Sequence, residues 1–170
     1  MREILIDTET TGFSPKSGHR IIELGCVEVI DGNITGRKYH QYINPERDLD
    51  ADAEDVHGIT ADFLQDKPVF KQVADEILDF IGDATLVAHN ASFDIDFLNS
   101  EMDLIGRDAV DKNRVVVDTL VIARKCFPEQ KNNLEALCRR LNVGHHYRDS
   151  HGALLDAEIL AGVYLKLRQL

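Results

Sequence analysis

Four acidic side chains occupy positions that the surrounding pattern predicts to be buried. In a strand, the period of two places Asp7 and Glu9 on one face, so two carboxylates project together from the end of the first apolar run. If residues 153–168 form a helix, Asp156 shares the face of the apolar residues that follow it. Asp94 falls in the same way on the apolar side of a second helix. The pattern therefore directs four carboxylates inward.

Carboxylates in such positions predict a cation. Burying an ionised carboxylate is costly unless a cation or a hydrogen-bond network compensates its charge. All-oxygen sites favour Mg²⁺ or Mn²⁺, whereas zinc would require more histidine or cysteine. Two such ions could clamp the attacking and leaving oxygens of a phosphodiester in an in-line displacement. We expect Asp7, Glu9, Asp94 and Asp156 to be catalytic residues and ligands of two Mg²⁺ or Mn²⁺ ions.

His151 is a candidate general base. It precedes Asp156 by five residues, which is the wrong spacing for one helical face, so the two side chains converge only if His151 lies in the loop or first turn. An unperturbed pKa of about 6.5 lets an imidazole accept a proton from an attacking water near neutrality. The alternative is a histidine satisfied by hydrogen bonds at a helix entry. Beside four inward acids, we favour the catalytic interpretation.

The composition limits the kinds of protein and substrate. The chain has 170 residues, of which 44% are hydrophobic, and this predicts one globular domain. Nineteen Lys and Arg against thirty Asp and Glu give a net charge of −11, which opposes tight non-specific binding to duplex nucleic acid. Any nucleic-acid substrate must therefore be held locally or delivered by a partner.

The cysteines and the apolar runs predict a cytoplasmic protein outside the membrane. Cys26, Cys126 and Cys138 are an odd number without CxxC spacing, and each lies in an apolar segment. This pattern favours buried, reduced thiols. No apolar run approaches the roughly 18 residues that a membrane helix needs, and no basic leader precedes the first strand.

Hydrophobic periodicity predicts alternating strands and helices. The strands are expected at residues 2–6, 20–30, 34–43, 85–88 and 115–117. Asp31 and Gly32 form a hairpin signal, so the second and third strands should be antiparallel neighbours. Residues 44–69 are expected to be a long surface connection with at most a short helix near 61–64, and with His57 in a loop. Helices are expected at 70–81, in the segment that His89 to Asp94 open, after Asp118, near 134–141 and at 153–168.

Three segments resemble, in their order, the exonuclease motifs of the DEDD superfamily. They are residues 7–12 (DTETTG), 89–98 (HNASFDIDFL) and 151–156 (HGALLD). The histidine five residues before the last aspartate is typical of the DEDDh branch. Over nearly the entire chain the sequence also resembles the proofreading epsilon subunits of bacterial DNA polymerase III, through residues 21–25, 56–59, 133–138 and 155–157.

The resemblance implies a fold and an activity. The fold would be α/β and ribonuclease H-like, with a central mixed five-stranded sheet, the second strand antiparallel to the rest, flanked by helices. Residues 1–170 would be a single exonuclease domain without the C-terminal tail by which relatives grip the polymerase. In the family the four acids bind two Mg²⁺ or Mn²⁺ ions and the histidine activates water. A nucleoside monophosphate then leaves from the 3′ end.

The resemblance also implies substrate-binding residues. Thr10, Thr11 and Gly12 match the turn whose backbone borders the terminal nucleotide. His57 matches a residue that contacts this nucleotide, and Phe93 matches a pocket wall near its base. Asp52 stands where close relatives have a glutamate near the 3′-hydroxyl, which is a departure from the family pattern.

The leading hypothesis is a metal-dependent 3′→5′ exonuclease that proofreads DNA 3′ ends, single-stranded or frayed, beside the catalytic subunit of DNA polymerase III. One alternative is an RNA-trimming member of the same branch, similar to oligoribonuclease or ribonuclease T, because the motifs do not distinguish a ribose from a deoxyribose substrate. Another is a non-catalytic subunit that stabilises a polymerase. The segments around His57 and 133–138 favour DNA. The complete acid set with His151 argues against a non-catalytic role, since a pure interaction module has no reason to bury four carboxylates.

Overall fold

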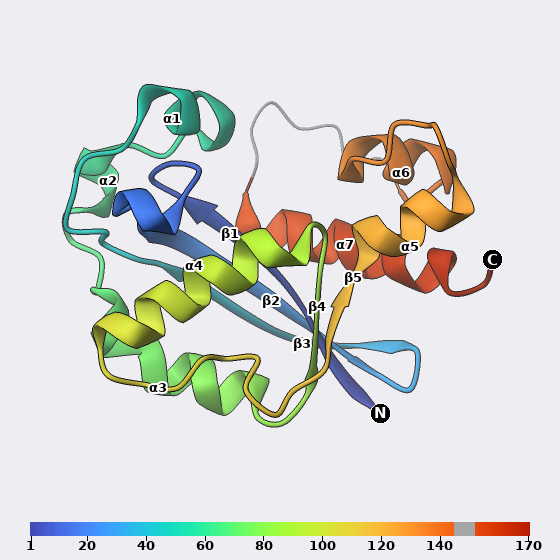
Figure 1. The fold of residues 1–170 in the computed structure, drawn as a ribbon, viewed down its shortest axis with the longest axis horizontal. Helices are drawn as coiled ribbons and strands as arrows, with labels where there is room; N and C mark the ends of the chain where they lie inside the picture. The colour runs from blue at the N-terminus through green and yellow to red at the C-terminus, as the bar shows by residue number, and fades with distance from the viewer. Residues whose placement is uncertain (145–151) are drawn as a thin grey trace.

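A mixed five-stranded sheet forms the centre of the protein, whose computed structural model describes residues 1–144 and 152–170 (Figure 1). The strand order is β3-β2-β1-β4-β5. β2 is antiparallel to β1 and β3, while β4 is parallel to β1 and β5, so the predicted sheet and its antiparallel second strand are confirmed. The strands are β1 (Arg2–Thr10), β2 (Ile21–Ile30), β3 (Asn33–Tyr42), β4 (Thr85–Ala88) and β5 (Val116–Asp118).

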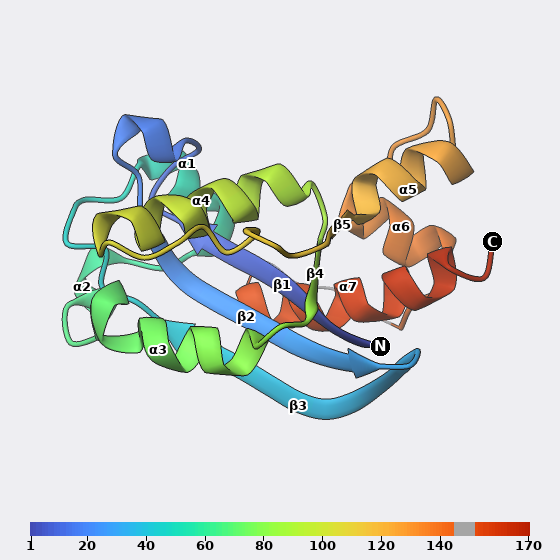
Figure 2. The same cartoon turned by 60° about the horizontal axis from the view of Figure 1, so that its bottom comes forward.

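Helices cover both faces of this sheet. The alternation of side chains along β1 separates two cores, because Ile4 and Ile6 pack with α3 and α4 while Leu5 packs with α7. Figure 1 shows α3 and α4 in front of the sheet and α7 behind it. Figure 2 shows α5 and α6 beside α7, with which they form a third core. The helices are η1 (Pro15–Ser17), α1 (Ala51–His57), α2 (Ala61–Leu64), α3 (Phe70–Ile81), α4 (Ala91–Leu104), α5 (Thr119–Cys126), α6 (Leu134–Arg140) and α7 (Ala153–Leu167).

Several sequence-based expectations need correction. Residues 51–57 form a helix, so His57 is its last residue and does not lie in a loop. The many acids of this segment obscured the helix, although two of them lie in its first turn, where they favour helix formation. β1 continues beyond the expected residue 6 to Thr10, because it pairs with β2 throughout. Asp7 and Glu9 therefore lie within the strand and not after its end. The apolar residues 115–117 predict a buried strand, but β5 is half-buried. Cys126 is half-buried as well, whereas Cys26 and Cys138 are buried as expected.

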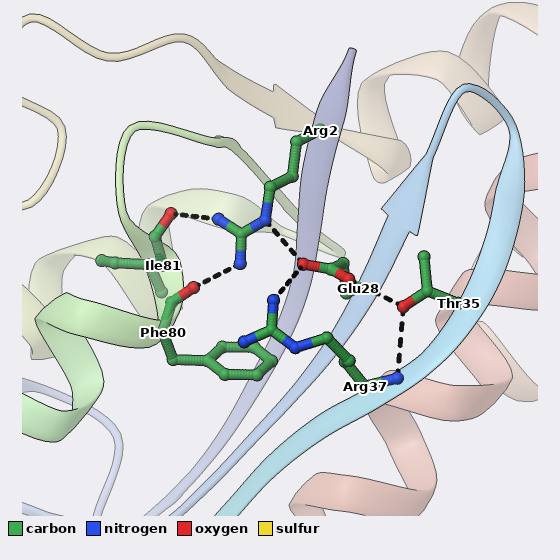
Figure 3. Close-up of polar contacts among 6 residues, drawn as sticks. All are labelled: Arg2, Glu28, Thr35, Arg37, Phe80 and Ile81. Carbon is green, nitrogen blue, oxygen red and sulfur yellow. Dashed lines mark hydrogen bonds and ion pairs between the residues drawn. The ribbon is translucent and has the colours of Figure 1, made fainter.

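The sheet end that holds the N-terminus is stabilised by ion pairs. Glu28 is buried on β2 and accepts hydrogen bonds from Arg2 at 2.6 Å, Arg37 at 3.0 Å and Thr35 at 2.8 Å (Figure 3). The Arg2 guanidinium also donates to the carbonyls of Phe80 and Ile81 at the end of α3. Two cations therefore surround one buried carboxylate, which satisfies its charge within the protein. Among residues 1–144 and 152–170, no helix is long and apolar enough to cross a membrane.

Candidate active site

Three carboxylates converge at the other end of β1. Asp7, Glu9 and Asp156 each offer an oxygen, and these oxygens all lie within 4.8 Å of one another. Asp7 and Glu9 come from the β1 face that α7 covers, and Asp156 comes from the first turn of α7. Glu9 and Asp156 are buried and Asp7 is half-buried. The three acids form an all-oxygen ligand set, which suits Mg²⁺ or Mn²⁺.

Asp94, the fourth predicted acid, reaches β1 from α4. One of its carboxylate oxygens accepts hydrogen bonds from the Thr8 amide at 3.0 Å and the Thr8 hydroxyl at 2.7 Å. Desolvation raises the pKa of Asp94 to about 7, although the bonds from Thr8 oppose that shift. Asp94 thus lies inward as predicted, joined to the residue between Asp7 and Glu9, but outside their 4.8 Å cluster.

The turn after β1 is rigidly held. The Thr11 hydroxyl accepts a hydrogen bond from the Arg20 amide at 3.0 Å and is hydrogen-bonded to His19 Nδ1 at 2.9 Å. His19 Nε2 in turn lies 3.2 Å from the Asp50 carboxylate. A Cβ added to Gly12 would lie 2.3 Å from the His19 ring, so a larger residue here would displace that side chain. These contacts hold the backbone that is predicted to border a terminal nucleotide.

Thr10 and His57 connect this turn to α1. The Thr10 hydroxyl donates to the Gly12 carbonyl at 2.6 Å, and the Thr10 carbonyl accepts a hydrogen bond from His57 Nε2 at 3.1 Å. His57 Nδ1 accepts from the Ile59 amide at 3.0 Å, so backbone groups occupy both ring nitrogens. Burial lowers the pKa of His57. In this structure His57 is a neutral imidazole that orients the turn.

The other two predicted substrate residues lie in different surroundings. Asp52 is exposed in the first turn of α1, and the Asp50 amide just before that helix donates to the Thr11 carbonyl at 2.8 Å. Phe93 lines a groove of about 760 Å³ between η1 and α4. The ring of Phe93 lies 4.9 Å from that of Phe97, and exposed Phe13 lines the same groove. Aromatic faces in an open groove can stack on nucleic-acid bases.

His151 lies outside the described residues, so its predicted role as general base stays a prediction. Sequence reasoning missed two supporting residues. Asn90 is the N-cap of α4, adopts the left-handed conformation with φ 62°, and lines the groove. Glu23 is buried on β2 and contacts the start of α7. Glu23 lies on the same face of β2 as Val27 and Val29, and this two-residue spacing could have identified it as a buried acid.

Comparisons with known proteins agree with this geometry. The family described as Exonuclease (RNase_T) matches residues 4–164. A protein of Rickettsia felis named DNA polymerase III subunit epsilon is 51% identical over 169 residues, covering 98% of this chain and 74% of that protein. The protein of the same name from Escherichia coli (strain K12) is 49% identical over 172 residues, covering 98% of this chain and 71% of that protein.

A solved structure agrees as well. Exonuclease X in complex with 5′ overhanging duplex DNA has a TM-score of 0.77 and 28% identity, covering 98% of this chain and 91% of that chain. The likeness and the sheet order confirm the ribonuclease H-like fold that the sequence predicts.

Proposed function

This chain belongs to the exonuclease family, and from that premise we propose that the cluster of Asp7, Glu9 and Asp156 is the metal centre of a proofreading 3′→5′ exonuclease. The chain is a 3′→5′ exonuclease of the kind named DNA polymerase III subunit epsilon. The observation that carries the assignment of the site is the convergence of three carboxylate oxygens within 4.8 Å. Such crowding of like charges is unfavourable unless a cation binds there.

The residues fit two Mg²⁺ or Mn²⁺ ions. Asp7, Glu9 and Asp156 would hold them, and Asp94 would complete the set from α4. When bound, the ions would neutralise these carboxylates, polarise the scissile phosphodiester and favour ionisation of the attacking water. The roles of the four acids as ligands follow from their chemistry and their placement.

The chain's own groups would orient the 3′ end. Thr10, Thr11 and Gly12 present a fixed backbone beside the cluster, and His57 holds it. Phe93 would support the base from the groove, and Asp52 would lie near the 3′-hydroxyl. His151 would accept the proton of the attacking water. A frayed end fits such a site better than a paired one, because the terminal nucleotide must first unpair and unstack.

The partners follow from the relatives' names. These proteins are named as subunits of DNA polymerase III, so the catalytic subunit of that polymerase is the proposed partner. The partner would deliver the DNA 3′ end, which suits a chain whose net charge of −11 opposes tight binding to duplex DNA by itself. A cytoplasmic location and a single exonuclease domain over residues 1–170 belong to the same proposal.

Digestion of labelled oligonucleotides tests this function. Matched and mismatched DNA 3′ ends and an RNA 3′ end would be compared in Mg²⁺, with EDTA as the metal-free control. We expect nucleoside 5′-monophosphates from DNA, faster release from the mismatched end, and no release in EDTA. If the two DNA strands are digested at equally different rates when each is single-stranded, the protein itself recognises the terminal base. Preferential digestion of RNA, or digestion that persists in EDTA, would contradict the proposal.

A further inference from the structure

Within the described residues, the N-cap position of the helix that carries Asp156 supplies no side-chain cap. The N-cap of α7 is Gly152, which has no side chain that could accept a hydrogen bond from the first turn. The Ala153 amide donates instead to Glu23 Oε1 at 2.9 Å, across 130 residues of sequence. A carboxylate at this position also interacts favourably with the positive end of the helix dipole. The cap of α7 therefore comes from the sheet.

Glu23 is itself held in place. Its residue is 2% exposed, and its second oxygen accepts a hydrogen bond from His40 Nε2 at 2.6 Å. His40 packs edge-on against Tyr42 with ring centroids 4.8 Å apart, and Tyr42 packs in the same way against Phe63 of α2. Each oxygen of Glu23 thus has its own donor, and the donor on β3 is fixed by aromatic packing. This arrangement gives Glu23 one orientation.

Glu23 also lies level with the acidic cluster. In the pairing of β1 with β2, Glu23 is opposite Glu9 and Gly25 is opposite Asp7. A Cβ on Gly25 would lie 2.5 Å from backbone atoms of Ala153 and Leu154, so glycine permits the first turn of α7 to rest on the sheet at this height. Two residues of β2 therefore determine how closely α7 approaches the ligands on β1.

We propose that Glu23 is a positioning residue, which caps α7 from the sheet and thereby holds Asp156 within reach of Asp7 and Glu9. This inference rests on the proposed function, since it assigns Glu23 an effect on the metal centre. Outer groups that orient metal ligands typically contribute about 10- to 100-fold in metal affinity. In this proposal Glu23 acts through the backbone of α7, to which it is hydrogen-bonded at Ala153.

The test compares Glu23→Leu, Glu23→Gln and Glu28→Leu in the full chain. Glu28 is the matched control, because it is a buried acid of the same strand whose partners lie at the opposite end (Figure 3). Mn²⁺ binding is measured by the electron paramagnetic resonance signal of free Mn²⁺, below the melting temperature of every variant. We expect Glu23→Leu to weaken Mn²⁺ binding by about tenfold. Glu28→Leu should bind Mn²⁺ as the wild type does.

Glu23→Gln should restore Mn²⁺ affinity to within about twofold of the wild type, because its amide oxygen can still accept the Ala153 hydrogen bond. Hydrogen exchange at the Ala153 amide provides a second measurement, and it should accelerate in Glu23→Leu alone. Wild-type Mn²⁺ affinity in Glu23→Leu, or equal losses in Glu23→Leu and Glu28→Leu, would overturn the positioning role.

Asp156→Asn separates this inference from the proposed function. If Asp156→Asn weakens Mn²⁺ binding while Glu23→Leu leaves it unchanged, the metal centre stands and the positioning role is wrong. If Asp156→Asn binds Mn²⁺ as the wild type does, the proposed metal centre itself is wrong, and the role of Glu23 falls with it.

Discussion

Two groups of carboxylates, one near each end of β1, have different neighbours. At the end of the N-terminus, Glu28 lies between Arg2 and Arg37, and Glu3 accepts hydrogen bonds from Tyr164 at 2.7 Å and Arg168 at 3.1 Å. At the other end, three carboxylates approach one another within 4.8 Å. Glu3 and Glu28 lie beside arginines, whereas Asp7, Glu9 and Asp156 lie beside one another.

This difference shows how a structural acid is distinguished from a functional one. Glu3, Asp7 and Glu9 follow the same alternation along β1 and lie on the same face. Glu3 and Glu9 are both buried and Asp7 is half-buried, so burial alone does not separate the structural acid from the other two. The neighbours do, because a guanidinium lies beside Glu3, whereas Asp7 and Glu9 lie within 4.8 Å of a third carboxylate, where we propose that a divalent ion binds. Three sets of variants test this contrast.

The largest effect is expected from comparing Asp156→Asn with Glu3→Gln. Asp156→Asn should lower the turnover of a single-stranded DNA substrate in Mg²⁺ by at least about 100-fold. Loss of a group that only orients a metal ligand costs up to about 100-fold, and loss of a ligand itself should cost at least as much. Without metal its melting temperature should equal or exceed that of the wild type, because one of several mutually repelling charges is removed. Glu3→Gln should keep turnover and lose stability. Wild-type turnover in Asp156→Asn would show that the cluster does not bind the catalytic ions.

A medium effect is expected from Glu28→Leu. This change leaves two guanidinium groups facing each other without their shared carboxylate, so the free energy of unfolding should fall by roughly 3 kcal/mol. Glu135→Ala is the surface control, since Glu135 and Arg139 form an exposed pair whose loss should change stability by less than about 0.5 kcal/mol. Urea unfolding curves in EDTA measure both. Similar losses from the two variants would contradict the structural role of the buried pair.

The smallest effect concerns pH and His57. Burial lowers the pKa of His57, so below about pH 6.5 the unfolded chain binds a proton that the folded chain does not. Stability from this residue is therefore fully present above pH 6.5 and is lost as pH falls toward the lowered pKa, by less than about 1.4 kcal/mol per pH unit. His89, whose pKa is lowered mainly by burial, contributes in the same direction.

The measurement is the free energy of unfolding from pH 5 to 8 in EDTA, for the wild type and for His57→Gln. The variant should show a shallower decline toward acid, because it retains only the other titrating groups. Identical slopes would mean that His57 is accessible to protons in the folded state, in conflict with its bonds to Thr10 and Ile59.

The sequence predicted the elements that carry the site with good accuracy. α3 and α7 lie where the helical period placed them, and the Asp31-Gly32 turn joins antiparallel strands as expected. The inward directions of Asp94 and Asp156 also follow from periodicity, because a helix fixes which side chains share a face. α1 was missed because its short, acidic sequence has little apolar periodicity, and its stability comes from contacts with the turn after β1.

Sequence by itself determined the chemistry of this protein, since residue types and local periods specify that carboxylates are present and face inward. Only the tertiary structure decided which of them meet. It brings Asp156 to Asp7 and Glu9 across more than 140 residues, gives Glu3 and Glu28 to arginines, and uses Glu23 to cap α7. The physical reason is that a charge is stabilised by whatever lies within a few ångströms. Strand pairing and helix packing bring those neighbours together from distant parts of the chain.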